Sequence, residues 1–352
     1  MTSPTADEQI LFLQHMQRLF DEGEFQATYK YALLLSVAEL AVELGDDSGK
    51  TLDLSLRLVG EKFTELYWRQ LAPYGTGQPE TVVEVLSQNL GTQASAVKHL
   101  LHVHSSNGGR LSDARSDRER WRKVATKITR IVSVMPVQHL QVIGGKQVQF
   151  LYEYPIVHRK LTLKPGVAFN LRRYQPLVQQ LARAAWIDHV RRNKRNAPML
   201  GQIDDLESFM FGSGRNILVA VAPVLARVQD GRCFYCGKAI SRNPEVDHFI
   251  PWSRYPRDTA HNFVLADAKC NNQKRGMLAA RLHLEHWLEQ IDRHGQEIGT
   301  LLAAEGFIAD VTGSVSVTRW AYQQAASASG NAWISGKLTE PVGSAYLQVL
   351  GA

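Results

Sequence analysis

Apolar residues recur at helical spacing through most of the first 72 residues of the 352-residue chain. The stretch "LFLQHMQRLF" places them on one face of a helix that Ser3 or Thr5 can cap. "YKYALLLSVAELAVEL" is apolar on nearly every side, so it is expected at the centre of a helical bundle. "LRLVGEKFTELYWRQL" predicts a third helix, and "TVVEVLSQN" and "TQASAVKHLLHVH" predict two shorter ones. We therefore assign residues 1–105 to a helical bundle domain.

The pattern becomes mixed over residues 106–225, which we interpret as a basic α/β region. "RERWRKVATKITRIVSVM" predicts a basic amphipathic helix, and alternation on both sides of Gly144 and Gly145 predicts a β-hairpin. "KLTLKPGVAFNL" adds one or two strands, and "YQPLVQQLARAAWIDHVRRNKR" predicts a helix that ends in a run of cations.

The end of the chain is helical again. After a segment at residues 226–282, we expect one long helix, or two with a break near Gly295. A shorter helix and an irregular tail complete a C-terminal segment at residues 283–352. The expected fold class is α+β, in a chain that is mostly helical.

Charge divides the chain more sharply than composition does. Residues 1–75 carry 6 Lys or Arg against 12 Asp or Glu, whereas residues 106–200 carry 19 against 5. A basic block of this kind is typical of a polyanion-binding surface, and the alternative is a solvated face without a partner. We expect residues 106–225 to grip nucleic acid, with phosphate contacts from Arg191, Arg192, Lys194 and Arg195.

Several classes of protein are excluded by simple features. No apolar run reaches the roughly 18 residues of a membrane helix, so no membrane partner is expected. The first residues carry acids where a secretion signal carries bases. An odd count of three cysteines does not suit a secreted disulfide framework, so a reducing, cytoplasmic setting is predicted.

All three cysteines lie within 38 residues, and their spacing suggests a metal site. Cys233 and Cys236 form a C-x2-C turn that presents two thiolates to a tetrahedral zinc ion. Cys270 is a third ligand, and Asp267 stands three residues before it, where a second C-x2-C would begin. Asp267 is our candidate for the fourth ligand, with His261 or a water molecule as alternatives. Three buried free cysteines would be the reading without a metal.

Polar residues of a different kind lie between the two halves of this cluster. "EVDHFIPWSR" predicts a strand that Pro251 ends, and its adjacent residues Asp247 and His248 must point to opposite sides. Asn262 precedes a short apolar run, and Asn271 lies on a following helix, from which it can turn back toward Asp247.

Together these residues resemble the HNH endonuclease family. The resemblance implies that residues 226–282 form a small nuclease domain with the ββα-metal fold. The match consists of C-x2-C, D-H, N and C-N-x2-K elements, and Asp267 replaces the third cysteine of the usual pattern. The resemblance implies that His248 is the general base, that Asp247 and Asn271 bind a catalytic Mg²⁺ or Mn²⁺, and that Asn262 orients the loop and the base. It further implies structural zinc on the cysteines and phosphate contacts from Lys274 and the neighbouring Arg275.

The chemistry agrees with that resemblance. A neutral imidazole can accept a proton from water near pH 7, and oxygen ligands suit Mg²⁺ or Mn²⁺ whereas thiolates suit zinc. Because a fold of this size has almost no core of its own, zinc is expected to supply much of its stability.

The expected function is a metal-dependent DNA endonuclease, in restriction or anti-phage defence. The alternatives are an RNA-cleaving HNH nuclease and a non-catalytic nucleic-acid-binding protein with a zinc knuckle. The helical domain carries no catalytic motif, so it is expected to bind a protein partner or a second copy of the chain.

Overall fold

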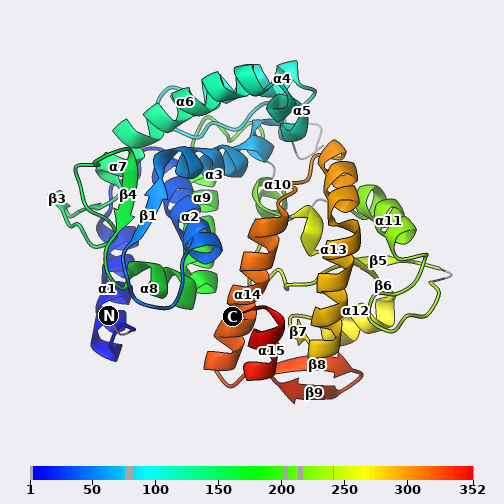
Figure 1. The fold of residues 1–352 in the computed structure, drawn as a ribbon. Coiled ribbons are helices and arrows are strands. Elements are labelled where there is room, and N and C mark those ends of the chain that lie inside the picture. The colour runs from blue at the N-terminus through cyan, green and yellow to red at the C-terminus, as the bar shows by residue number, and fades with distance from the viewer. Residues whose placement is uncertain (1–2, 76–81, 201–204, 213–216, 241, 352) are drawn as a thin grey trace. The chain divides into compact units, whose positions relative to one another are not determined.

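The computed structural model describes residues 3–75, 82–200, 205–212, 217–240 and 242–351. The chain forms two compact units, Met1–Gly212 and Ser213–Ala352, which are described separately below. Both are mostly helical and carry small sheets, so the α+β class is confirmed (Figure 1). In the described part of the chain, none of the helices is both long enough and apolar enough for a membrane crossing.

The first unit is built around one buried helix. α2 (Tyr29–Leu44) exposes almost no side chain, and it packs against α3 (Leu56–Trp68), α8 (Val167–Arg173) and α9 (Gln175–Arg192). α1 (Ala6–Glu22) begins at Thr5, whose hydroxyl accepts from the Glu8 amide while the Glu8 carboxylate accepts from the Thr5 amide. The predicted central helix and the predicted cap are both confirmed.

Small strands tie the bundle to the basic region. β1 (Leu52–Ser55) pairs antiparallel with β4 (Lys160–Leu163), and β2 (Val142–Ile143) pairs with β3 (Lys146–Gln147). Gly144 and Gly145 both adopt positive φ, 55° and 73°, as a two-residue hairpin turn requires. The β1–β4 pairing crosses the boundary expected at residue 105. Residues from both of these regions lie in one compact unit, Met1–Gly212.

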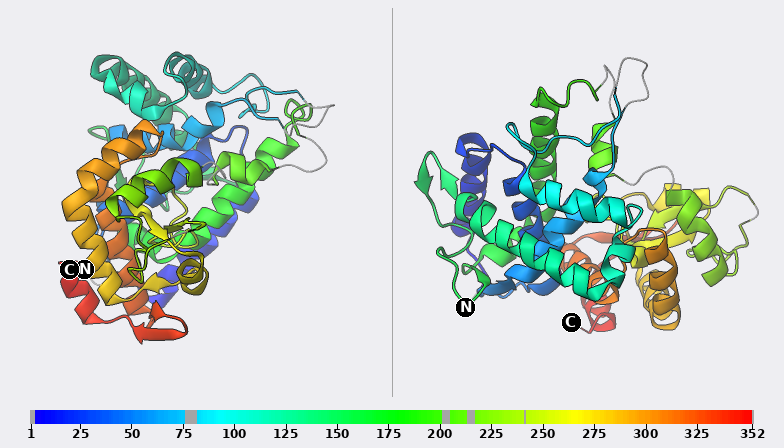
Figure 2. Two further views of the ribbon diagram at one scale, coloured as in Figure 1. Left: turned by 90° about the vertical axis from the view of Figure 1, so that its right-hand side faces the viewer. Right: turned by 90° about the horizontal axis from the view of Figure 1, so that it is seen from above.

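Shorter elements complete the first unit. They are η1 (Arg69–Leu71), α4 (Ser95–Ser106), α5 (Leu111–Ser116), α6 (Arg118–Val134), α7 (Pro136–His139) and α10 (Leu206–Met210). α6 packs against α3, α4 and α5 (Figure 2).

The helix expected in "TVVEVLSQN" is wrong for its described part. Residues 82–90 form no helix, and isolated bridges join Glu84 to Tyr74 and Asn89 to Ala27. The reason is Gln88, whose buried carbonyl Oε1 accepts from both the Thr28 hydroxyl and the Trp186 indole. These buried tertiary bonds override the weak local preference for a helix.

The second unit contains the predicted ββα element. β5 (Glu245–His248) pairs antiparallel with β6 (Phe263–Ala266), after the short η2 (Ala260–Asn262), and α12 (Ala268–Lys274) follows. α11 (Ile217–Val228) packs against β5 and β6, and α13 (Arg281–Ala304) packs against α11. α13 is a single helix, so the alternative break near Gly295 does not occur.

The core of the second unit corrects a further expectation. Apolar side chains from α11, η2, β6 and α13 form one buried cluster: Val221, Leu225, Ala260, Phe263, Leu265, Ile298 and Leu302. The ββα element therefore shares a hydrophobic core with helices on both sides of it in sequence, so its stability does not depend on a bound metal alone.

The tail also differs from the irregular segment that was expected. After α14 (Val311–Ser327), β8 (Asn331–Ser335) and β9 (Leu338–Pro341) form a hairpin, seen in red in Figure 2, and α15 (Ser344–Val349) follows. β8 pairs in parallel with β7 (Leu278–Ala279), and the buried Trp333 accepts a hydrogen bond from the Ala280 amide. Local periodicity does not predict these strands, because their pairing depends on β7, which is distant in sequence.

Candidate active site and zinc cluster

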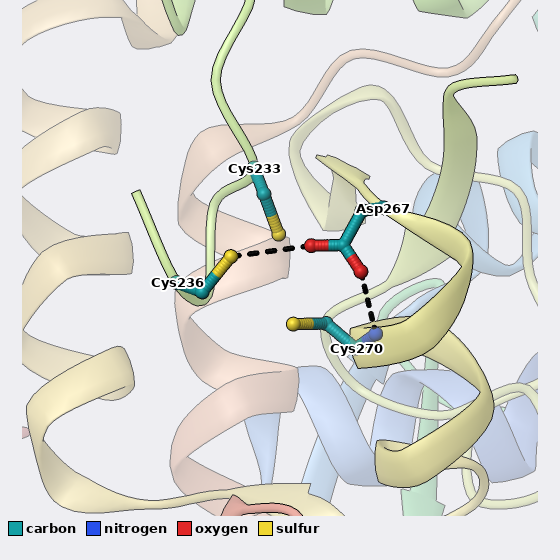
Figure 3. Close-up of side chains that lie close together, drawn as sticks. All are labelled: Cys233, Cys236, Asp267 and Cys270. Carbon is teal, nitrogen blue, oxygen red and sulfur yellow. Dashed lines mark hydrogen bonds between the residues drawn. The ribbon is translucent and has the colours of Figure 1, made fainter. Parts of the chain in front are cut away.

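The C-x2-C turn and the start of α12 bring four side chains together. The thiols of Cys233, Cys236 and Cys270 and a carboxylate oxygen of Asp267 all lie within 4.8 Å of one another (Figure 3). The turn is closed by hydrogen bonds between Cys233 and its neighbours, and Gly237 adopts the positive φ, 68°, that the turn needs. Three sulfurs and one oxygen at this separation fit a tetrahedral zinc ion.

Asp267 has a structural reason to replace a cysteine. It is the N-cap of α12, and its Oδ1 accepts from the Cys270 amide at 2.8 Å, while the Cys236 thiol donates to its Oδ2 at 3.2 Å. Burial alone would raise the pKa of Asp267, but these donors and the other thiols lower it to about 2. Asp267 is therefore a carboxylate that serves both the helix and the cluster.

The alternative fourth ligand, His261, lies elsewhere. Its Nε2 donates to the Gly295 carbonyl at 2.9 Å, and its ring is buried against α13. Among the five candidate ligands from sequence, the structure thus groups the three cysteines with Asp267 and leaves His261 out.

The electrostatics of the four side chains favour a bound cation. Burial raises the pKa of both Cys233 and Cys270, and the charge of Cys233 adds to the effect on Cys270. Several thiolates and a carboxylate so close together repel one another unless a positive ion balances them. Zinc bound there would remove that repulsion, so the donor set fits the metal that the sequence predicted.

Asp247 lies on the buried side of β5. Its Oδ2 accepts two hydrogen bonds, from the Tyr235 hydroxyl at 2.6 Å and from the Lys274 ammonium at 2.8 Å. Tyr235 stands between the two cysteines of the turn, so the zinc cluster and Asp247 share a direct link. Burial, and then the charge of Asp247, raise the pKa of Tyr235 well above its usual value, so its hydroxyl stays protonated and donates.

The position of Lys274 does not suit the phosphate contact expected of it. Its side chain is completely buried, and its ammonium donates to Asp247 and to the His248 carbonyl at 2.9 Å. A lysine in this position holds β5 against α12 and leaves no ammonium for a substrate phosphate. Burial lowers the pKa of Lys274, and the carboxylate of Asp247 opposes that effect. Arg275, the neighbouring candidate, is exposed, and its Nε donates to the Asn272 carbonyl.

Asn271 reaches β5, but through a residue that sequence reasoning did not name. Its Nδ2 donates to Glu245 Oε2 at 2.7 Å. Glu245 and Asp247 are two residues apart on one strand, so their side chains leave the same face. Asp247 receives both of its donors on Oδ2, and neither of them uses Oδ1. Carboxylate and amide oxygens are the ligands that Mg²⁺ and Mn²⁺ prefer, so Asp247, Asn271 and Glu245 are the candidates for a cation here.

His248 lies on the other face of β5, as predicted for neighbouring residues of a strand. Its Nε2 is 2.9 Å from Asp258 Oδ1, and its ring contacts Trp252 and Phe263. The carboxylate fixes Nε2 as the protonated nitrogen of the neutral ring, so Nδ1 is the nitrogen with a lone pair. This arrangement suits a base that removes a proton from water.

Asn262 fixes the loop after β5. Its Oδ1 accepts from the Ile250 amide at 2.7 Å, and its Nδ2 donates to the Ile250 carbonyl at 3.0 Å. A third bond joins the Asn262 carbonyl to the Phe249 amide. The side chain is buried, and it holds the backbone that follows His248.

The cationic run is exposed at the end of α9. Arg191, Arg192, Lys194 and Arg195 all face solvent, and Arg192 also pairs with Asp188 at 2.8 Å. The run belongs to the first unit, whereas the ββα residues belong to the second.

Three residues that bear on the site were missed from sequence. Glu245 could have been found from the E-x-D spacing, which puts two carboxylates on one face of a strand. Tyr235 and Asp258 gave no such signal, because their partners Asp247 and His248 lie 12 and 10 residues away.

Two family models match the chain. One, described as a domain of unknown function (DUF8808), matches residues 13–205, which is more than half of the chain. The other, described as HNH endonuclease, matches residues 233–280, the segment that holds the cysteine cluster and the ββα element. Neither a curated protein nor a solved structure matches the chain. The predicted resemblance is confirmed, and residues 233–280 form an HNH endonuclease domain.

Proposed function

Because the chain belongs to the DUF8808 family and carries an HNH endonuclease domain, we propose that it is a metal-dependent endonuclease that hydrolyses DNA. The observation that carries the proposal is the adjacent pair Asp247 and His248 at the end of β5. Asp258 holds the His248 ring, and Asn271 on α12 bonds to Glu245, two residues before Asp247 on the same strand.

The chain's own residues account for the proton transfer. Asp258 holds the His248 ring through Nε2, so Nδ1 accepts the proton of the attacking water. Asn262 keeps the loop beside His248 in place through its two bonds to Ile250. Asp247 and Asn271 are the residues that would hold a divalent cation through their side-chain oxygens, and Glu245 accepts a hydrogen bond from the Asn271 amide. Bound there, the cation would neutralise charge that develops on the phosphate and on the leaving oxygen.

The basic block supports DNA as the polyanion. Arg191, Arg192, Lys194 and Arg195 are exposed, as phosphate contact requires, and Arg275 is exposed close to α12. A role in restriction or anti-phage defence, in the reducing cytoplasm, is the setting we propose. The three cysteines are free thiols in the structure, which agrees with such a compartment. The first unit would serve self-association or a protein partner in addition to DNA.

Incubation of the pure protein with supercoiled plasmid tests the proposal. Cleavage is expected with Mg²⁺ or Mn²⁺ and not with EDTA, and the gel distinguishes nicks from double-strand breaks. His248→Ala should lower the rate by about 10²–10⁴-fold, because it removes only the proton acceptor, and should leave DNA binding and zinc content unchanged.

Other outcomes of the same assay point to the alternatives. Cleavage of a labelled RNA but not of plasmid would make the chain an RNA nuclease. DNA binding without cleavage under any metal would indicate a non-catalytic binding protein. Cleavage by His248→Ala at the wild-type rate would show that His248 is not the base.

A further inference from the structure

α6 presents two opposite faces. Its buried face packs on α3 and α4 through Val124, Ala125, Ile128 and Val132. Its outer face carries Arg122, Lys127 and Arg130, all of them exposed. The apolar residues of α6 thus pack into the core of the first unit, and its cations face solvent.

The three outer cations lack acidic partners. Among the described residues, no salt bridge or side-chain hydrogen bond joins Arg122, Lys127 or Arg130 to a carboxylate. Lys123 differs, because its ammonium pairs with Glu119 at 2.9 Å. Unpaired cations on one face repel one another, so an anion bound there would lower their electrostatic energy.

The same residues line an open groove. It has a volume of about 920 Å³, and its walls include Arg122, Lys127 and Arg130 together with Thr126. Val134 and Met135 also line it and are about half exposed, 55% and 49%. We call this feature the α6 groove. It combines charge with apolar surface, a combination found in nucleic-acid-binding grooves.

The spacing of the cations suits a phosphate backbone. Arg122 and Arg130 are eight residues apart, which is about 12 Å along a helix at ~1.5 Å per residue. Successive phosphates of one DNA strand advance by ~3.4 Å along the duplex axis, so several of them fall within that length. Lys127 lies between the two arginines and reaches the same stretch.

We propose that the α6 groove binds the phosphate backbone of duplex DNA, at a site separate from the HNH residues. The proposal rests on the proposed function in naming DNA as the polyanion. It assigns a role to a face of the first unit whose cations the structure leaves without partners. The groove would contact phosphates and not bases, so its contribution to binding affinity would not depend on the DNA sequence.

Binding titrations over a range of salt concentrations test the α6 groove. The inactive His248→Ala protein is titrated against a fluorescent duplex, with and without Arg122→Gln, Lys127→Gln and Arg130→Gln. Each phosphate contact contributes about −0.9 to the slope of log affinity against log salt. The triple variant should therefore bind all duplexes more weakly and flatten the slope by about two to three units.

A matched control removes the same charge elsewhere on the first unit. Arg18, Arg110 and Lys160 are surface cations that already pair with Glu22, Asp113 and Asp53. Changing these three to Gln should leave the slope nearly unchanged. Equal flattening in both triple variants would overturn the proposal, because it would show a response to net charge alone. Thermal denaturation of each variant verifies that the fold is intact.

A labelled polyglutamate peptide and plasmid cleavage complete the test. If the three cations govern binding of the peptide but not of the duplex, the groove is an acidic-protein site and the proposal is wrong. A wild-type protein that cuts plasmid while the triple variant keeps the full salt slope would refute the α6 groove alone. A protein that never cuts, but whose DNA affinity depends on the three cations, would refute the nuclease proposal and support the groove.

Discussion

Asp258 contacts the proposed base, His248, directly. Its carboxylate lies 2.9 Å from His248 Nε2, and the rings of Trp252 and Phe263 pack against the His248 ring. A base that loses this acceptor can turn about its side-chain bonds. A misplacement of about 1 Å in a reacting group can cost roughly 10²-fold in rate.

We therefore expect Asp258→Ala to lower kcat by about 10²-fold and to leave KM for DNA nearly unchanged. Asp258→Asn should retain much more activity, because its amide oxygen still accepts from Nε2–H. Asp292→Ala, at an exposed aspartate on α13, is the matched control. Plasmid-cleavage kinetics give the comparison, and an unchanged kcat for Asp258→Ala would exclude a positioning role.

Elements show where the sequence sufficed and where it did not. The mostly apolar "YKYALLLSVAELAVEL" predicted the buried α2, and the C-x2-C and D-H spacings predicted the cluster of three cysteines with Asp267 and the strand β5. These signals are local, so they survive in a single sequence.

The failures share a different cause. Residues 82–90 form no helix because Gln88 bonds to Thr28 and Trp186, and the tail forms β8 and β9 because β7 offers a partner. The sequence predicts Lys274 as a phosphate ligand, whereas its ammonium is buried against Asp247, and that burial depends on how α12 packs on β5. Each of these outcomes depends on contacts between residues distant in sequence, which no periodicity records.

The start of α12 gives a prediction for the zinc cluster. Purified protein should contain about one zinc ion per chain, and Cys233→Ser should lower both zinc content and melting temperature. Asp267→Ala removes a ligand and an N-cap together, and loss of a cap costs about 0.5–2 kcal/mol. Asp267→Ser keeps a capping oxygen but is a poor zinc ligand, so it separates the two roles.

We expect Asp267→Ser to lose zinc to a chelator faster than the wild type, while it stays more stable than Asp267→Ala. Asp267→Cys should hold zinc at least as tightly as the wild type, because it completes four thiolates. Elemental analysis and chelator competition give the readout. Equal zinc retention in all four proteins would show that Asp267 caps α12 without binding the metal.

At the scale of the whole molecule, the two units divide the chemistry. The unit Met1–Gly212 holds the exposed cations of α6 and the run at the end of α9, whereas Ser213–Ala352 holds the HNH residues and the zinc cluster. An HNH domain of 48 residues has little surface with which to hold a duplex, so affinity supplied by a second unit would complement it. Both units also bury histidines, and these give a prediction about the stability of the molecule.

Burial lowers the pKa of six histidines below the usual value of 6.5: His15, His99, His104, His189, His261 and His283. Folding therefore favours their neutral form. Above pH ~6.5 the rings are neutral in both states, and their contribution to stability is fully present. As the pH falls below ~6.5, the unfolded chain takes up protons first, so the free energy of unfolding decreases until the folded rings titrate as well.

His261 offers the sharpest single test of this argument. Its Nε2–H donates to the Gly295 carbonyl, and its Nδ1 is buried without a partner, so protonation would place a charge with no acceptor inside the second unit. His261→Gln keeps a donor for Gly295 but cannot titrate. The variant should be less stable than the wild type at pH 7, and its melting temperature should fall less between pH 7 and pH 5. One titrating group fewer changes the slope by at most about 1.4 kcal/mol per pH unit. Zinc release by acid affects both proteins alike, so parallel melting curves for the two over this range would show that His261 does not bind a proton differently in the folded and unfolded states.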